Sequence, residues 1–394
     1  MDHPKKQLLL ICDANLDRAP RVRAAYNALK DEFNFTMAGY EPPPFNDVRY
    51  IKIPKKPKAK RRNISWHLKL PSPIKKLCSL FIKIYLLAVE PKQDKRSIKD
   101  QHFHLFENEE CDLIINHHLN TLELAVALKN KLGVPLINNL HEYYPREFED
   151  QEVWIKYEGP KKIKICQTFL PQADQVFCVC EGIRLEYLKE FGVDSVVIRN
   201  DKPYQDITPS SNLGETIKLI HHGAALKSRN LHLLIEAVKD LKGFTLDLML
   251  LPTQQDYFDE LVEMCAVHDH IRIIPTVEPN EIINFINQYD VGVFLLEPVN
   301  FNYKMALPNK LFEFVQARLT IAITPNQEMA RIVEEYELGT IAKDYSVGAF
   351  SDALLKLSRK NIERFKNQSH VHAKELSSEN TYRIIQEEVK KLVG

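Results

Sequence analysis

The sequence has no net charge, no long apolar run and no paired cysteine motif, and each absence excludes a class of protein. Lys and Arg number 53, as do Asp and Glu, so the chain as a whole is not attracted to nucleic acid, and we expect no nucleic-acid partner. No stretch reaches the roughly 18 apolar residues of a membrane-spanning helix. Seven cysteines without a Cys-x-x-Cys pair are typical of reduced, buried thiols, which indicates a cytoplasmic protein.

Several patterns of ligand and metal sites are missing as well. The sequence has no P-loop, no Gly-x-Ser-x-Gly elbow, no zinc-ligand spacing and no Asp-x-Asp triplet. Without a carboxylate pair a divalent cation has no evident site, so we expect neither a metal nor another cofactor. Lysine, arginine and the amino ends of helices would then have to neutralise any phosphate that the protein binds.

Short apolar runs alternate with helical patterns along the chain, in two series. Such alternation is typical of parallel sheets with helices on both faces. The predicted strands of the first series are 8–12, 113–116, 135–138, 176–180 and 196–198, and those of the second are 217–221, 246–250, 271–274, 291–295, 320–324 and 339–342. We therefore expect an α/β protein with two Rossmann-like, doubly wound domains that face a central cleft.

The domain boundaries follow from the same pattern. Residues 1–200 form the predicted first domain and residues 215–370 the second, joined by a linker at 201–214 that is rich in Pro and Ser. The helical pattern at 371–394 predicts a final helix that can pack back on the first domain.

Residues 52–100 interrupt the alternation with a strongly basic insertion. They contain fifteen Lys and Arg against three Asp and Glu, an excess of twelve positive charges, around the mostly apolar stretch 74–89. A basic patch beside an apolar helix can dock on anionic lipid head groups, which would make the protein peripheral on the inner face of a membrane. A core-packed helix beside a solvated basic loop is the alternative, and the sequence leaves both open.

The most informative segment lies at 306–318, Ala-Leu-Pro-Asn-Lys-Leu-Phe-Glu-Phe-Val-Gln-Ala-Arg. Pro308 suits the first turn of a helix and Asn309 can cap it. The helix would carry Lys310 and, one turn on, Glu313. Its free N–H groups and positive dipole end suit a phosphate, and the carboxylate can accept hydrogen bonds from sugar hydroxyls.

This segment resembles the Pro-Asn-Lys-Leu-x-Glu signature of retaining glycosyltransferases of family 4, which have the GT-B fold. The resemblance implies that the helix start binds the donor nucleotide through Asn309, Lys310, Leu311, Phe312 and Glu313. The alternative is an ordinary amphipathic helix, with Leu311 and Phe312 inward and the two charged residues solvated.

Matching motifs in the first half extend the resemblance. Arg21 follows Asp17 in a segment similar to the family's D-x-R-V opening, although the glycine-rich form of that loop is absent. Residues 112–122 resemble a family segment in which a strand ends in a histidine, and residues 138–145 resemble the D-x-H-E-x-x-P motif. Residues 173–182 match the family's strand and turn ADxVxxVSEG, with Cys180 in place of Ser. The resemblance implies that the acceptor domain approaches the reacting sugar with Arg21, His117, His118, His141 and Glu142.

The second half resembles the family's donor domain, with departures. Ile220-His-His-Gly223 looks like the first strand and glycine loop, and Arg229, or Lys227 in its place, would bind the diphosphate. Ala224 stands where members often have arginine, and Met305 stands where the first of two glutamates is usual. Arg318 and Thr320 replace the glycine and proline that usually follow the helix.

We therefore predict a metal-independent retaining glycosyltransferase, which moves a sugar from a nucleotide-sugar donor to a saccharide or lipid-linked acceptor. A sugar-nucleotide epimerase of the same architecture is one alternative. A membrane-peripheral protein that binds nucleotide sugars without activity is another, because Ala224 and Met305 depart from the family.

Overall fold

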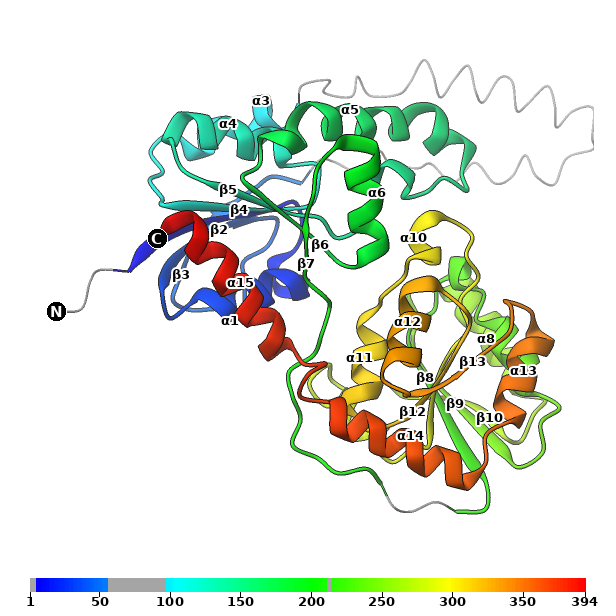
Figure 1. Cartoon of the computed structure of the whole chain (residues 1–394). Helices are drawn as coiled ribbons and strands as arrows, with labels where there is room; N and C mark the ends of the chain where they lie inside the picture. Colours follow the sequence, from blue (N-terminus) through cyan, green and yellow to red (C-terminus); the bar gives the residue numbers. More distant parts are fainter. Residues whose placement is uncertain (1–4, 56–96, 211–213) are drawn as a thin grey trace, which may run out of the picture.

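The computed structural model describes residues 5–55, 97–210 and 214–394, which form two α/β domains side by side (Figure 1). The basic insertion predicted at 52–100 lies mostly outside these residues. Within the described part, no helix combines the length and the apolar character that crossing a bilayer requires.

The N-terminal domain is built on a seven-stranded parallel sheet of order β3-β2-β1-β4-β5-β6-β7. Its strands are β1 (Lys6–Cys12), β2 (Phe33–Gly39), β3 (Val48–Lys52), β4 (Leu113–His117), β5 (Leu136–Asn139), β6 (Gln175–Cys178) and β7 (Val196–Val197). Its main helices are α1 (Pro20–Leu29), α3 (Ile98–His102), α4 (Leu122–Leu132), α5 (Gly159–Phe169) and α6 (Glu181–Phe191). The sequence pattern missed β2 and β3, because neither is a continuous apolar run.

The C-terminal domain has a six-stranded parallel sheet of order β10-β9-β8-β11-β12-β13. Its strands are β8 (Ile217–Ala224), β9 (Phe244–Leu251), β10 (Ile271–Ile274), β11 (Val291–Phe294), β12 (Thr320–Ile323) and β13 (Gly339–Ile341). Its helices are α7 (His232–Val238), α8 (Gln255–Cys265), α9 (Ile282–Ile286), α10 (Phe301–Lys304), α11 (Asn309–Gln316), α12 (Gln327–Glu335), α13 (Val347–Leu355) and α14 (Arg359–His372). The predicted fold class, with two doubly wound parallel-sheet domains, is confirmed.

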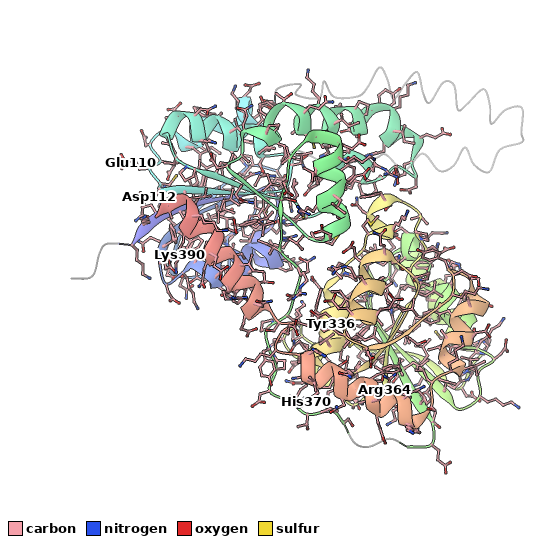
Figure 2. The ribbon with its side chains drawn as sticks, in the orientation of Figure 1. Glu110, Asp112, Tyr336, Arg364, His370 and Lys390 are labelled. Atoms are coloured by element: carbon pink, nitrogen blue, oxygen red, sulfur yellow. The ribbon has the colours of Figure 1, made fainter. Side chains whose placement is uncertain are left out.

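The chain passes between the domains twice, and the two passages lie together. The backbone N–H of Ser378 donates to the carbonyl of Lys202 at 2.9 Å. Beyond this point α15 (Ser378–Val393) packs along α1 of the N-terminal domain (Figure 1). Lys390, which Figure 2 labels on α15, lies 3.3 Å from the Glu32 carboxylate.

A direct interface also joins the domains away from these passages. Glu328 at the start of α12 accepts a hydrogen bond of 2.9 Å from the backbone N–H of Gly182, at the amino end of α6. The side chain of Asn302 in α10 accepts a hydrogen bond of 2.8 Å from the backbone N–H of Tyr143 and donates one of 3.2 Å to its carbonyl. The carboxyl ends of both sheets are thereby held facing a common cleft, where ligands bind in folds of this type.

Candidate functional site

Two cationic side chains, those of Arg229 and Lys310, lie next to the backbone of Gly223 at the carboxyl end of β8. Gly223 has a φ of +135°, in the region that favours glycine. A Cβ at this position would lie 3.4 Å from a guanidinium nitrogen of Arg229 and 3.4 Å from Nζ of Lys310. The absence of a side chain leaves both cations open to a ligand. This arrangement of Gly223, Arg229 and Lys310, here called the cradle, suits a phosphate.

Lys310 is held in this position by its neighbours. The Nδ1 atom of His221 donates to the carbonyl of Val293 at 2.9 Å, which leaves its Nε2 to accept from Nζ of Lys310 at 3.2 Å. The ammonium also lies 4.1 Å from the ring centroid of Phe294. Burial, and then the charge of Arg229, lower the pKa of Lys310 well below its usual value. An anion in the cradle would reverse that effect.

The amino end of α11 reaches the cleft without a side-chain cap. Pro308, in extended conformation, occupies the capping position, and Asn309 is the first helical residue, so the predicted capping role of Asn309 is wrong. Leu311 and Phe312 are buried in the core at 1% and 0% exposure, so only their backbone belongs to the helix start. Their packing follows the amphipathic-helix alternative in this one respect.

The charged residues of α11 are not solvated, contrary to that alternative. Lys310 and Glu313 are only 6% and 7% exposed. The Glu313 carboxylate lies 2.9 Å from Nζ of Lys202 in the linker and 3.4 Å from Nε2 of His222. Burial lowers the pKa of His222 to about 4, so Lys202 is the charged partner of Glu313 at neutral pH.

A cavity of about 540 Å³ adjoins Glu313 between the two domains. Asn309, Glu313 and Ile283 line it from the C-terminal domain, and Arg21 and Tyr382 line it from α1 and α15. Its size is in the range of pockets that hold small-molecule ligands.

The three predicted histidines of the N-terminal domain form one hydrogen-bonded chain. Asp13 lies 2.6 Å from Nδ1 of His118, whose Nε2 lies 3.1 Å from Nδ1 of His141. Nε2 of His141 in turn lies 3.2 Å from Nδ1 of His117, whose own Nε2 is buried without a partner among the described residues. Burial lowers the pKa values of His117 and His141, so both stay neutral. His118 adopts a φ of +73°, which is strained for a residue other than glycine.

Arg21 and Glu142 flank this chain on different sides. The Arg21 guanidinium is buried and donates to the carbonyls of Leu140 and Ile198, at 3.4 and 2.9 Å. Burial lowers its pKa to about 10. Glu142 lies at the mouth of a separate crevice of about 450 Å³, where desolvation and the charge of Glu147 raise its pKa to about 7.

Lys227 and Met305, which the sequence analysis named, lie outside the cradle, and three residues that contact the site residues were not predicted. The side chain of Lys227 is exposed, and among the described contacts none joins it to the cradle. Met305 packs its sulfur against Gly182 of the other domain, where a Cβ would meet it at 2.5 Å. The residues that sequence reasoning missed are Asp13, Lys202 and His221; the signal for Asp13 was its place directly after a buried strand.

The described residues contain no group of three His, Cys, Asp or Glu side chains that could hold a metal ion.

Two Rossmann-like parallel-sheet domains that face a common cleft define the architecture of GT-B glycosyltransferases. Residues 91–200 match the family described as Glycosyltransferase Family 4, and residues 205–371 match Glycosyl transferases group 1. One match lies in each domain and together they cover more than half of the chain, so the chain belongs to these glycosyltransferases, and the resemblance to family 4 is confirmed.

Solved structures share the whole fold at low sequence identity. Sucrose-phosphate synthase from Thermosynechococcus elongatus superposes with a TM-score of 0.71 at 13% identity, over 98% of this chain and 99% of that one. A glycosyltransferase from Rickettsia africae gives 0.67 at 11%, over 99% of both chains. HepE from Anabaena, in complex with UDP-glucose, gives 0.66 at 11%, over 98% of this chain and 100% of that one. No curated protein sequence matches the chain significantly.

Proposed function

We propose that the protein transfers a hexosyl group from a nucleotide-diphosphate sugar to a saccharide acceptor, with retention of configuration and without a metal. The observation that carries the proposal is the convergence of Arg229 and Lys310 over Gly223, at the uncapped start of α11. The complex of HepE with UDP-glucose makes a UDP-sugar the first donor to test.

In this proposal each part of such a donor binds at a different place. The diphosphate binds between Arg229, Lys310 and the backbone of Gly223, where fixed positive charge stabilises the leaving group as its bond to the sugar breaks. Glu313 accepts hydrogen bonds from the ribose, and the base occupies the interdomain cavity that Asn309 lines.

The N-terminal domain presents the acceptor to the anomeric carbon. We assign Arg21, His117, His118, His141 and Glu142 to the acceptor side, and the proposal gives none of them the role of a covalent nucleophile. The departing phosphate oxygen takes the proton of the attacking hydroxyl on the same face of the sugar, which gives retention. A lipid-linked acceptor would account for the basic insertion at 52–100.

A panel of nucleotide sugars tests the proposal through release of nucleoside diphosphate, with and without saccharides and lipid extract, and with EDTA added. We expect acceptor-dependent release that survives EDTA, and a product whose anomeric coupling constant in NMR matches that of the donor. Conversion of one nucleotide sugar into another would indicate the epimerase, and binding without any turnover would indicate the inactive protein. Inversion, or a need for Mg²⁺, would refute the corresponding part of the proposal.

A further inference from the structure

We infer that the crevice of about 450 Å³ in the N-terminal domain binds a sugar ring of the acceptor, and that this ring carries no phosphate or carboxylate group. The crevice is separate from the interdomain cavity, and its lining includes His118, His141 and Glu142. The inference rests on the proposed function only where it identifies the bound sugar as the acceptor. Binding of a saccharide to the crevice can be measured without turnover.

The wall of the crevice offers an aromatic surface at an unusual point of the backbone. Trp154 begins a π-helical turn (Trp154–Glu158), a rare form that often occurs at functional sites. Phe148 packs edge-on against its ring, with centroids 4.9 Å apart. Tyr144 also lines the crevice. The C–H face of a pyranose ring packs on such a surface by dispersion and exclusion of water.

The indole N–H of Trp154 lacks a hydrogen-bond acceptor among the described residues. Buried tryptophan N–H groups usually have a partner, so this donor is suited to an oxygen that a ligand supplies. A ring hydroxyl or a glycosidic oxygen has the required chemistry.

The polar lining disfavours an anionic ring. Three carboxyl groups, those of Asp13, Glu142 and Glu147, face one ammonium group, that of Lys162. The Nζ atom of Lys162 donates to Oδ1 of Asn120 at 2.5 Å and lies 5.6 Å from the ring centroid of Tyr144. Carboxyl groups accept hydrogen bonds from sugar hydroxyls. A phosphate in the crevice would oppose ionisation of Glu142, whose pKa is already about 7, and of Glu147, whose pKa burial also raises.

The position of the crevice relates it to the reacting centre. His118 and His141 line it and continue, through the hydrogen bond to His117, into the interior on the side of Arg21. Arg21 itself lines the interdomain cavity. The histidine chain therefore connects the lining of the crevice with the interior next to Arg21.

Trp154 provides its own reporter. The chain has two tryptophans, so Trp66→Phe leaves Trp154 as the single source of indole fluorescence. We would titrate this variant of the full chain, without donor, with methyl hexosides and N-acetylhexosamines, and with glucose 6-phosphate and glucuronate. We expect a saturable change in emission with a neutral sugar, and binding of its anionic counterpart that is weaker by about tenfold or more.

A charge variant tests the cause of the discrimination. Glu147→Gln should narrow the gap between neutral and anionic sugars severalfold. Glu158→Gln, in the same segment but outside the crevice lining, should leave the gap unchanged. Circular dichroism would check that both variants fold.

The outcomes separate this inference from the proposed function. If no sugar alters the emission at millimolar concentration, or if the anionic sugars bind as tightly as the neutral ones, the inference is wrong. Transfer to a phosphorylated acceptor in preference to a neutral one would overturn it while supporting the transferase. Saccharide binding without any transfer would support the crevice and refute the transferase.

Discussion

Lys310 combines a buried position with a proposed role that requires positive charge. Burial and Arg229 lower the pKa of Lys310, so its ammonium loses protons more readily in the empty site than in water. A diphosphate in the cradle favours the charged form, so we predict that binding takes up a proton and weakens as pH rises. Calorimetry with a nucleoside diphosphate, in buffers of different ionisation enthalpy, measures the uptake.

Lys310→Met should abolish this proton uptake and weaken binding about ten- to a hundredfold, since a hydrogen bond to a charged group contributes roughly 1.5–3 kcal/mol. Lys304→Met, at an exposed lysine on nearby α10, is the control. Uptake that persists in Lys310→Met would assign the proton to another group.

Glu313 allows a test that separates ribose from phosphate. We predict that Glu313→Gln weakens binding of a nucleoside diphosphate about tenfold or more but does not weaken binding of inorganic pyrophosphate. Pyrophosphate lacks the ribose hydroxyls that would donate hydrogen bonds to the carboxylate. Competition binding of both ligands to the same preparation gives the comparison. Equal losses for the two would place Glu313 against the phosphate instead.

Glu142 makes stability depend on pH in a defined direction. Its pKa is raised from 4.5 to about 7 by desolvation, so the folded state holds this proton more tightly than the unfolded chain. The contribution of Glu142 to the free energy of unfolding therefore falls as pH rises from about 4.5 to about 7 and then stays low.

Replacing this carboxyl removes the penalty. We predict that the melting temperature of Glu142→Gln, relative to the wild type, increases between about pH 5 and about pH 8. Glu152→Gln, exposed on the following segment, should show no such trend. A difference that does not change with pH would contradict the raised pKa.

At this scale the sequence predicts residues whose place follows from strand ends, and misses those that depend on tertiary contacts. His117, His118 and His141 end up together because parallel strands finish at one edge of a sheet. The role of His221 depends instead on a carbonyl of β11, and that of Lys202 on the folding of the linker against α11. The spacing of residues along the chain does not record either contact.

Among the helices, α11 is fixed at the end opposite the cradle by both interdomain passages. The amide of Gln316 donates to the carbonyls of Ala373 and Leu376, at 2.6 and 3.2 Å, and accepts from the backbone of Gln205 at 3.1 Å. Arg318 donates to the carbonyl of Gln205 as well. The helix that carries the proposed donor residues is thus directly bonded to the segments about which the domains would rotate.

Arg318 occupies a position where the family usually has glycine, and its φ of +60° explains that preference. Its fully buried guanidinium also contacts Nδ1 of His370 at 3.1 Å. Figure 2 shows His370 near the end of α14, before the chain turns toward α15. The strain, about 1–2 kcal/mol for a residue with a Cβ, is offset by these hydrogen bonds.

We predict that Arg318→Gly destabilises the protein by several kcal/mol, because the lost hydrogen bonds to a charged group outweigh the relief of strain. Glu337→Gly is the matched control, since Glu337 has a φ of +49° but is exposed, and it should be close to neutral. Denaturant unfolding of both variants gives the comparison. A stabilised Arg318→Gly would show that the strain dominates.

Elements were predictable where their pattern is strong. All six strands of the C-terminal sheet coincide with predicted strands. The signal is clearest for an inner strand such as β11, which is buried at every position and is apolar throughout. Strands β2 and β3 alternate apolar and polar residues near one edge of the other sheet, so no continuous run marks them.

The positive charge of the molecule is concentrated in residues 52–100, which have an excess of twelve basic residues, and the rest of the chain has the balancing acidic excess. We predict that the protein binds anionic vesicles through residues 52–100, since each basic residue near such a surface contributes about 1 kcal/mol. Binding should weaken with salt, because exposed charges are screened over about 8–10 Å at physiological ionic strength. Co-sedimentation with vesicles over a salt series measures both.

Changing the basic residues at the start of this segment to Gln should reduce vesicle binding and leave nucleotide-sugar binding unaltered; they are Lys55, Lys56, Lys58, Lys60, Arg61 and Arg62. The same number of exposed lysines replaced in the C-terminal domain is the control. If the wild-type protein does not bind anionic vesicles even at low salt, a soluble acceptor becomes the better interpretation.

The return of α15 to the N-terminal domain sets an order for folding during synthesis. Ile385 and Val389 of this helix belong to the same core as Leu8 and Leu10 of β1. The ribosome makes the entire C-terminal domain between these two parts of one core. Domains of multidomain proteins generally fold as units while the chain emerges. Here the later domain can be complete while the earlier one still exposes the apolar face that α15 will cover, so the nascent N-terminal domain is the part that needs protection from aggregation.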